Sequence, residues 1–326
     1  MKTTLAVNGV RTLVMGLVSS TLLVGIADAQ SSAAQRVRPS TYRGLAHGGG
    51  SGGQVGVASS NGMTVTLANA TTLATALLGS GVTLSGTPTL TGAAAQAGTF
   101  SNAPGLVGFS SGIILSSGNA VAAATNYAGA DLPDTVEGGP GNSQLSGLIG
   151  GTPTFDATLL TFSFIPTAST IFFNYTFASA EYPNFVGSPF NDVFGFFVNG
   201  TNRGTLPGTS TPVSINNVNV STNSQFFNKY NGSGDPLPYG GETKVLTVTA
   251  PVNAGQVNTI IIGIADASDP NLDSAIFVQA GSLSTTPPPV TTPPPTTPVP
   301  PSLILTLIGL AGAGVYMALR QRSARA

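Results

Sequence analysis

The stretch YTFASAEYPNFVGSPFNDVFGFF, residues 175–197, decides the fold because no other part of the chain is as rich in aromatic residues. Its beginning belongs to a run over 170–179 in which large apolar side chains alternate with polar ones, the pattern of a half-buried β-strand. Its end belongs to a run over 192–199 that is apolar on both faces, which is typical of a strand inside a sheet. The stretch therefore predicts two core strands joined by a turn.

Three polar side chains in the same stretch can carry chemistry: Glu181, Asn191 and Asp192. They fall in the predicted turn, so we expect them at the rim of the fold rather than inside it. A carboxylate that is buried without a partner costs on the order of several kcal/mol, and a chain with only 7% charged residues offers few bases to pair with it. The sequence therefore raises the question of what neutralises the negative charges of these acids.

The rest of the chain repeats the pattern of short apolar runs separated by turns. The hydrophobic content of 41% is enough for a buried core, and 42 Gly and 24 Pro supply many turns. Further predicted elements are strands over 158–165, 245–250, 257–265 and 274–280 and one helix over 71–78. We therefore expect an all-β fold, a β-sandwich of two mainly antiparallel sheets with about eight to twelve strands and one short helix near its start.

The charge balance argues against a nucleic-acid partner. Residues 61–284 carry eleven acidic and only three basic residues, a net charge of −8. Nucleic-acid binding requires a basic surface that contacts phosphates. The body of the protein has the opposite charge.

The N-terminal residues are typical of an export signal. Two basic residues precede an apolar run over 13–26, and the small residues Ala27 and Ala29 suit cleavage before residue 30. Residues 1–29 are therefore predicted to be a signal peptide, followed over 30–61 by a flexible Gly-rich lead-in. The chain has no cysteine, so an exported form is held together by its core or by bound ions and not by disulfides.

The C-terminal residues predict an anchor. Residues 285–301 are rich in Thr and Pro and are expected to form an extended linker. An apolar run over 303–319 follows and is just long enough to span a membrane, and three arginines end the chain. Residues 302–326 are therefore predicted to be a membrane anchor or a sorting signal.

Two known families resemble parts of this chain. The blocks TTLATALLGSGVTL, AGTFSNAPGLVGFSSGIILSSGNA, NYTFASAEYPNFVGSPFNDVFGFFVNG and IADASDPNLDSAIFVQAGS, in this order, resemble the bacterial choice-of-anchor L domain, which we place at residues 62–284. The usual FASEEY of that family has a second acid where this chain has Ala180. The tail resembles the PEP-CTERM signal, with PVPPS at 298–302 in place of Val-Pro-Glu-Pro. These resemblances imply an exported surface protein, a Gram-negative host and processing by an exosortase.

Catalysis is not expected. The only histidine, His47, lies in the predicted lead-in, and there is no cysteine, so the sequence offers neither a Ser–His triad nor a thiol nucleophile. One enzymatic alternative is a glycosidase-type carboxylate pair formed by Glu181 and Asp192. The related non-catalytic alternative is a carbohydrate-binding module whose sugar platform consists of Tyr182, Phe185 and Phe190.

Calcium is the cofactor that the acidic loops favour. This hard cation takes six to eight oxygen ligands from carboxylates, amides and the backbone, and the segment ADASDPNLD concentrates such groups over 265–273. A third acidic loop, ADLPDTVEG, spans 130–138. Solvated turns are the alternative for each loop, because Asp and Asn bond their own backbone in turns. The predicted ligands are Glu181, Asn191, Asp192, Asp266, Asp269 and Asp273.

Taken together, these features predict an exported, surface-anchored and non-catalytic protein that acts in adhesion, in surface structure or in a biofilm matrix. Its predicted partners are an exosortase, the membrane through residues 303–319, and an extracellular polysaccharide or other surface proteins.

Overall fold

The computed structural model of the chain describes residues 56–57, 60–103, 105–126 and 132–288. The chain divides into two compact units, Met1–Pro287 and Pro288–Ala326, and every element named below belongs to the first. The predicted signal peptide and membrane span lie outside the described residues. Within the described part, no helix is both long enough and apolar enough to cross a membrane.

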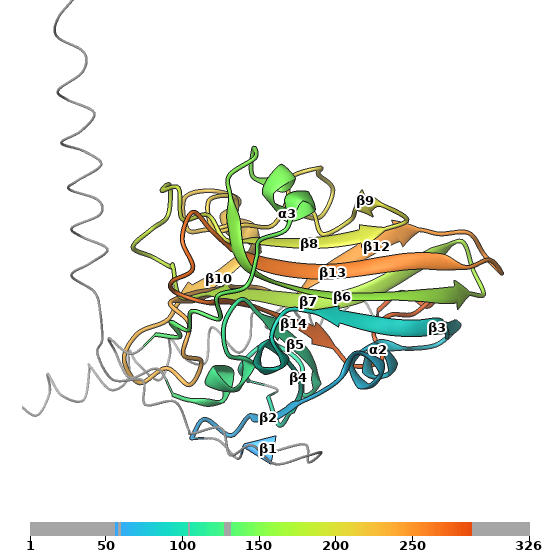
Figure 1. Cartoon of the computed structure of the whole chain (residues 1–326), viewed down its shortest axis with the longest axis horizontal. Coiled ribbons are helices and arrows are strands. Elements are labelled where there is room, and N and C mark those ends of the chain that lie inside the picture. Colours follow the sequence, from blue (N-terminus) through green and yellow to red (C-terminus); the bar gives the residue numbers. More distant parts are fainter. Residues whose placement is uncertain (1–55, 58–59, 104, 127–131, 289–326) are drawn as a thin grey trace, which may run out of the picture. The chain divides into compact units, whose positions relative to one another are not determined.

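Two antiparallel sheets form the fold, as predicted (Figure 1). The larger sheet contains, in spatial order, β1 (Gly56–Val57), β2 (Thr64–Leu67), β4 (Ala97–Ser101), β5 (Gly112–Ser116), β14 (Ser274–Gln279), β7 (Thr170–Ser179), β11 (Gly241–Thr243) and β10 (Phe227–Tyr230), and β12 (Leu246–Pro251) also pairs with β7. The smaller sheet contains, in spatial order, β3 (Val82–Thr91), β6 (Thr154–Pro166), β13 (Asn258–Ala267), β8 (Val193–Val198) and β9 (Thr201–Asn202). The described residues thus hold 14 strands rather than eight to twelve, because several strands are too short to show a sequence period.

Short helices cover parts of the sheets. The helices are α2 (Ala70–Leu77), α3 (Ser143–Leu148) and the 3-10 helices η1 (Ala94–Gln96), η2 (Ala120–Ala124) and η3 (Ser224–Phe226). The predicted helix over 71–78 is confirmed as α2, one residue earlier along the chain. Its N-cap is Asn69, whose side chain accepts a hydrogen bond from the amide of Thr72.

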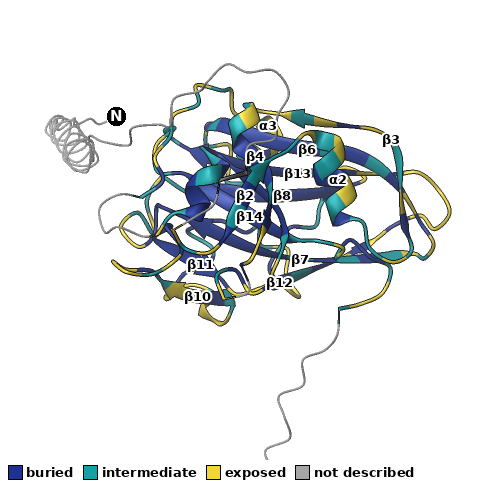
Figure 2. Ribbon diagram, turned by 90° about the horizontal axis from the view of Figure 1, so that it is seen from below, coloured by how far each residue is buried: buried dark blue, intermediate teal, exposed yellow. Residues whose placement is uncertain are grey.

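The main core lies between the two sheets, where the aromatic residues of β7 and β8 meet. Phe173 and Phe196 approach with ring centroids 3.9 Å apart, and Tyr175 and Phe194 with centroids 4.9 Å apart. Both pairs join the larger sheet to the smaller one, and all four side chains are buried. Figure 2 shows the buried strands in the middle of the molecule and exposed residues at the loops. The stretch that opens the sequence argument therefore supplies two core strands, as expected.

The outer faces of the sheets are also covered in part, which explains why β8 is apolar on both sides. Val193 and Phe197 of β8 pack with Leu145 of α3 on the outer face of the smaller sheet. On the outer face of the larger sheet, Phe277 of β14 packs with residues of η2. The strands that carry the acidic residues are thus buried on both faces.

Candidate functional site

Four acidic side chains gather at one end of the sandwich. Asp192 directly precedes β8, and Asp266 lies near the end of β13, which pairs with β8. Asp273 directly precedes β14, and Glu181 lies two residues after the end of β7, which pairs with β14. Both sheets therefore contribute, and we call Glu181, Asp192, Asp266 and Asp273 the acidic cluster.

Antiparallel pairing places these residues together. Ala265 of β13 lies opposite Val193 of β8, so the residues next to them, Asp266 and Asp192, lie at the same end. In the larger sheet the backbone amide of Ala180 donates to the carbonyl oxygen of Asp273, at 3.0 Å. A local irregularity of β13 between Ile264 and Asp266 shifts the register at this end. Each acid stands at or near a strand end, where the two core strands and their partners stop.

Asp192 connects the two sheets. Its Oδ2 atom accepts a hydrogen bond from the Ser274 hydroxyl of β14 at 2.6 Å, and its Oδ1 atom accepts one from the amide of Ala267 of β13 at 2.9 Å. Both oxygens therefore have donors. Asp192 is also the neighbour whose negative charge raises the pKa of each of the other three members of the cluster.

The other three acids have carboxyl oxygens without hydrogen-bond partners in the structure. These atoms are both oxygens of Asp266, Oδ2 of Asp273 and Oε2 of Glu181. Ser117 lies near Asp266 and lowers its pKa slightly, but no hydrogen bond of ordinary geometry joins them. Buried polar atoms are almost always hydrogen-bonded in folded proteins, so four unpaired carboxyl oxygens in one cluster require an explanation.

Burial corrects one prediction. We expected the acids at the rim of the sandwich, but the exposed fraction is 2% for Glu181, 0% for Asp192, 1% for Asp266 and 0% for Asp273. The sequence suggested the rim because the acids fall in turns. Loops from other parts of the chain cover the strand ends, so the acids are inside.

One of the covering segments is the acidic loop after residue 131. The amide of Thr135 donates to Oδ1 of Asp273 at 2.9 Å, and the amide of Asp273 donates to the carbonyl oxygen of Pro133 at 2.9 Å. Oδ1 of Asp134 accepts a hydrogen bond from the amide of Leu272 at 3.2 Å. The sequence identified this loop as acidic but gave no sign that it folds over the cluster.

A fifth buried acid, Asp156, was missed as a site residue. It is fully buried, and its negative charge helps to raise the pKa of Asp266. Its two carboxylate oxygens accept hydrogen bonds from the amides of Gly139, at 2.5 Å, and Glu137, at 3.0 Å. No motif marks it, because its partners are backbone amides supplied by a distant loop.

Two predicted ligands point their side-chain oxygens elsewhere. Oδ1 of Asn191 accepts a hydrogen bond from the amide of Asn216 at 2.9 Å, and Oδ1 of Asp269 accepts one from the amide of Asn271 at 3.0 Å. Both residues are only half-buried. Asp269 is close enough for its charge to raise the pKa of Glu181 and of Asp192, so it lies at the margin of the cluster.

The buried acids have strongly raised pKa values. Burial is the main cause in each case, because it removes water from the charged form. It raises the pKa of Asp192 to about 7, of Asp273 to about 8 and of Glu181 to about 11, and it raises that of Asp266 well above its usual value. Hydrogen bonds from Ser274 and Thr135 oppose the shifts of Asp192 and Asp273 respectively.

Basic residues do not neutralise the cluster. The described residues include three bases, of which Lys229 forms an ion pair with Asp235 at 2.6 Å and Lys244 donates to the carbonyl oxygen of Gln225 at 2.9 Å. The third, Arg203, lines a pocket that contains no member of the cluster. No base among the described residues therefore neutralises the acids of the cluster.

As it stands, the cluster is not a preformed metal centre. Within the described part of the chain, no group of three or more acidic or histidine side chains is arranged so that it could already hold a metal ion. Any bound cation must draw the free oxygens toward a common centre. The hydrogen bonds of Asp192 at the middle of the cluster leave the oxygens of its neighbours free to do so.

The predicted sugar platform does not form. Tyr182 is fully buried, and its hydroxyl donates to the carbonyl oxygen of Val218. Phe185 and Phe190 are half-buried and pack edge to face, with ring centroids 5.3 Å apart and an interplanar angle of 83°. The three residues are close in the sequence, but the ring of Tyr182 lies in the core and cannot share an exposed surface with Phe185 and Phe190.

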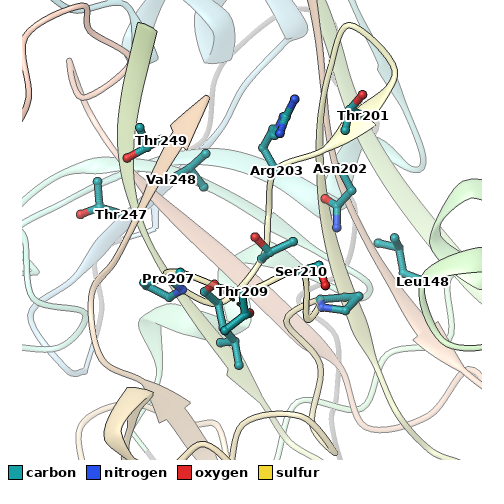
Figure 3. Close-up of a pocket in the computed structure, with 14 residues that line it drawn as sticks. Leu148, Thr201, Asn202, Arg203, Pro207, Thr209, Ser210, Thr247, Val248 and Thr249 are labelled. Atoms are coloured by element: carbon teal, nitrogen blue, oxygen red, sulfur yellow. Dashed lines mark hydrogen bonds between the residues drawn. The ribbon is translucent and has the colours of Figure 1, made fainter. Parts of the chain in front are cut away.

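A pocket with both polar and apolar lining residues lies elsewhere, between the loop after β9 and strand β12 (Figure 3). It has a volume of about 520 Å³. Arg203 extends along one side of it, and its Nε atom is buried without a hydrogen-bond partner. The side chains of Thr201, Thr209, Thr247 and Thr249 surround the pocket, with no acidic residue among those that line it. The positively charged guanidinium group of Arg203, with threonine hydroxyl groups around it, suits a ligand that carries a negative charge and hydroxyl groups.

Comparison with solved structures adds little. Two structures of a β-glucosidase from Kluyveromyces marxianus, one of them in complex with glucose, match 39% of this chain at 14% and 15% identity, with TM-scores of 0.19 and 0.20. The match covers only 11% of the glucosidase chain, so this protein spans about a tenth of that enzyme's length. A likeness at this level carries no argument about activity.

Comparison with sequence families is informative. No curated protein matches the chain significantly. The family model of the choice-of-anchor L domain matches residues 60–284, which is more than half of the chain and includes the acidic cluster and the whole sandwich from β2 to β14. The chain therefore belongs to the choice-of-anchor L domain family.

Proposed function

We propose that this protein is a structural or adhesive component of a bacterial cell surface or of the matrix around the cells. Membership of the choice-of-anchor L family indicates an exported, surface-anchored and non-catalytic protein, and this is the observation that carries the proposal. The finer role in adhesion, surface structure or a biofilm rests on the sequence features on either side of the domain.

Those features suit a domain that is displayed away from a membrane. In this proposal residues 1–29 direct export, the Thr/Pro-rich linker over 285–301 separates the sandwich from the membrane, and residues 302–326 serve as the anchor or as the signal for an exosortase. The linker is about 50 Å long if it is fully extended, at roughly 3.1 Å per residue. The host is proposed to be a Gram-negative bacterium, because the tail resembles a PEP-CTERM signal.

The buried position of the acids supports the non-catalytic assignment. A glycosidase needs both carboxyl groups to reach the sugar, but Glu181 and Asp192 are 2% and 0% exposed. Neither residue lines either of the two pockets described for the structure.

Surface exposure and fractionation test this proposal. The gene product should be found in the envelope or extracellular fraction, and an antibody against the sandwich should label intact cells. Deletion of residues 302–326 should release the protein into the medium while leaving its thermal midpoint unchanged. Recovery of the native protein from the cytoplasm, with a full-length N-terminus, would contradict the proposal.

A second candidate function is the binding of an extracellular polysaccharide, which the Arg203 pocket favours. Oδ1 of Asn202 accepts hydrogen bonds from the amides of Phe196 and Gly204, both at 3.0 Å, which fixes the amide group of Asn202 beside the arginine. Small-molecule sites commonly occupy about 300–1,000 Å³, and this pocket falls in that range. An arginine surrounded by hydroxyl groups suits a sugar that carries a carboxylate.

An array of acidic and neutral polysaccharides tests this candidate. The full-length protein should bind uronate-containing chains, and Arg203→Met should lose most of that binding, whereas Lys229→Met, which removes a base that lies outside the pocket, should not. Equal binding to neutral chains, or binding that Arg203→Met leaves unchanged, would exclude the pocket as the binding site.

A further inference from the structure

The acidic cluster has carboxyl oxygens without hydrogen-bond partners, whereas another buried acid in the same fold has a donor for each of its oxygens. Glu242 is also buried, at 2% exposure, but its two oxygens accept hydrogen bonds from the side-chain amides of Asn228, at 2.8 Å, and Asn231, at 2.5 Å. The fold can therefore supply donors to a buried acid. It does not supply them to the two oxygens of Asp266 or to Oδ2 of Asp273.

The position of these unpaired groups limits what can satisfy them. Asp266 is 1% and Asp273 0% exposed, so bulk water does not reach them. The charges of Asp192 and Asp273 raise the pKa of Asp266, and the charge of Asp192 also raises that of Asp273, so these groups are close enough for their charges to interact. Several carboxylates so close together cannot all stay charged without a counter-ion.

The tight packing around the cluster indicates that Asp273 is held in place and not free to turn toward water. Gly118 lies so close to its carboxyl group that a Cβ atom at this position would overlap it. On the other side, the amide of Thr135 holds Oδ1 of Asp273, and Oδ2 stays free. The oxygen without a hydrogen-bond partner, Oδ2, is also the carboxyl atom that lies nearest to Gly118.

We propose that the acidic cluster binds one calcium ion, with Asp266 and Asp273 as direct carboxylate ligands, Glu181 as a further ligand through Oε2, and Asp192 as the charge at the centre that connects the two sheets. This inference goes beyond the proposed surface function, since it concerns what holds one end of the sandwich together. Asn191 and Asp269 are left out of the ligand set because both are only half-buried, whereas the members of the cluster are inside the fold.

The chemistry of the donors selects the class of ion. Every candidate ligand is an oxygen, and the described residues contain no histidine or cysteine, so a zinc site is not supported. Calcium accepts six to eight oxygens in irregular arrangements, whereas magnesium demands a near-ideal octahedron and gives up its water reluctantly. A set of carboxylates that must converge from loops in both sheets suits the less demanding ion.

Isothermal titration of the chelator-treated full-length protein at pH 8 tests the proposal. We expect one calcium ion per chain and weaker binding of magnesium. Asp266→Asn should weaken calcium binding by at least about tenfold, because outer-shell changes alone cost about 10- to 100-fold at metal sites. The matched control is Asp235→Asn, an acid in the exposed ion pair with Lys229, which should bind calcium normally.

The outcomes are distinct. Absence of a calcium signal in the unmodified protein, together with equal melting midpoints in calcium and in chelator, would overturn the proposal, and so would normal binding by Asp266→Asn. A preference for magnesium would overturn the choice of ion. If Asp266→Asn does not fold, Asp273→Asn replaces it, and the measurements on the unmodified protein still decide. None of these results depends on where the protein is located in the cell.

Discussion

The acidic cluster predicts an unusual dependence of stability on pH when no divalent cation is present. Asp273 has a folded-state pKa of about 8, while an unfolded aspartate titrates near 3.8. The folded protein therefore keeps a proton that the unfolded chain has already lost. Stability from this group is complete below the unfolded pKa and is lost as the pH rises through about 8.

The size of the effect follows from linkage. Each retained proton lowers the free energy of unfolding by about 1.4 kcal/mol for each unit by which the pH rises. Between pH 5 and pH 7, Asp273 alone therefore lowers it by about 3 kcal/mol. For a domain of this size, about 2–4 °C of melting temperature corresponds to 1 kcal/mol, so the midpoint should fall by roughly 6–12 °C.

Two other members of the cluster act in the same direction as Asp273. Glu181, with a pKa of about 11, and Asp192, with a pKa of about 7, also keep protons in this interval, which adds to the slope. Burial also raises the pKa of Asp266, the fourth member of the cluster, and the further acids that face the cluster are Asp134, Asp156 and Asp269. No base of the described residues contacts the cluster, so no ion pair compensates.

Thermal melts in chelator at pH 5, 6 and 7, followed by circular dichroism, measure the slope. Asp273→Asn should flatten it by about 1.4 kcal/mol per unit of pH, whereas Asp235→Asn, an acid whose pKa is lowered by its hydrogen bond from Lys229, should not. A midpoint that is constant or rises between pH 5 and pH 7 in the unmodified protein would refute the reasoning, because the acids would then be charged in the folded state.

Two further predictions concern the support of the site. Gly118→Ala should lower the thermal midpoint and weaken calcium binding, because the added Cβ atom would overlap the carboxyl group of Asp273. The control in the thermal melts is Gly147→Ala, which lies in a helix with open space around it and should leave the midpoint unchanged. Tyr182→Phe should lower the free energy of unfolding by about 1–3 kcal/mol in denaturant titrations, because it leaves the buried carbonyl oxygen of Val218 without its donor; an unchanged midpoint would show that water replaces the hydroxyl.

The strands were predictable because their side chains repeat with a period of two. Phe173, Tyr175 and Phe177 alternate with polar residues, and the structure places them on the inner face of β7 over the residues predicted. The strands that the sequence argument missed include short ones such as β9, Thr201–Asn202, which is held by pairing with β8 rather than by any pattern of its own. They also include β3, Val82–Thr91, whose ten residues do not alternate regularly between buried and exposed.

The acidic cluster was predictable only in part. Five of its residues and neighbours stood out in the sequence because Asp and Glu are rare in this chain. Their burial was not predictable, because it depends on the loop around Pro133 and on Gly118, both far away in sequence. Asp156 was missed for the same reason, since its donors are backbone amides of Glu137 and Gly139.

The sugar platform failed for a related reason. Tyr182, Phe185 and Phe190 are close in sequence, and an aromatic group of this kind can form a flat surface. The fold instead uses the Tyr182 ring to fill the core beside Phe227, with ring centroids 5.1 Å apart. Aromatic content alone does not distinguish a buried ring from an exposed one, and the alternation that marks strands is absent from this turn.

The most direct test of the account is a crystal structure of the full-length protein grown in calcium at pH 8, with anomalous diffraction data to locate the ion. The account predicts one calcium ion within about 2.3–2.6 Å of carboxylate oxygens of Asp266 and Asp273, with Glu181 turned toward it. A cluster that stays free of ions in saturating calcium, with its carboxyl groups bonded to one another through protons, would contradict it.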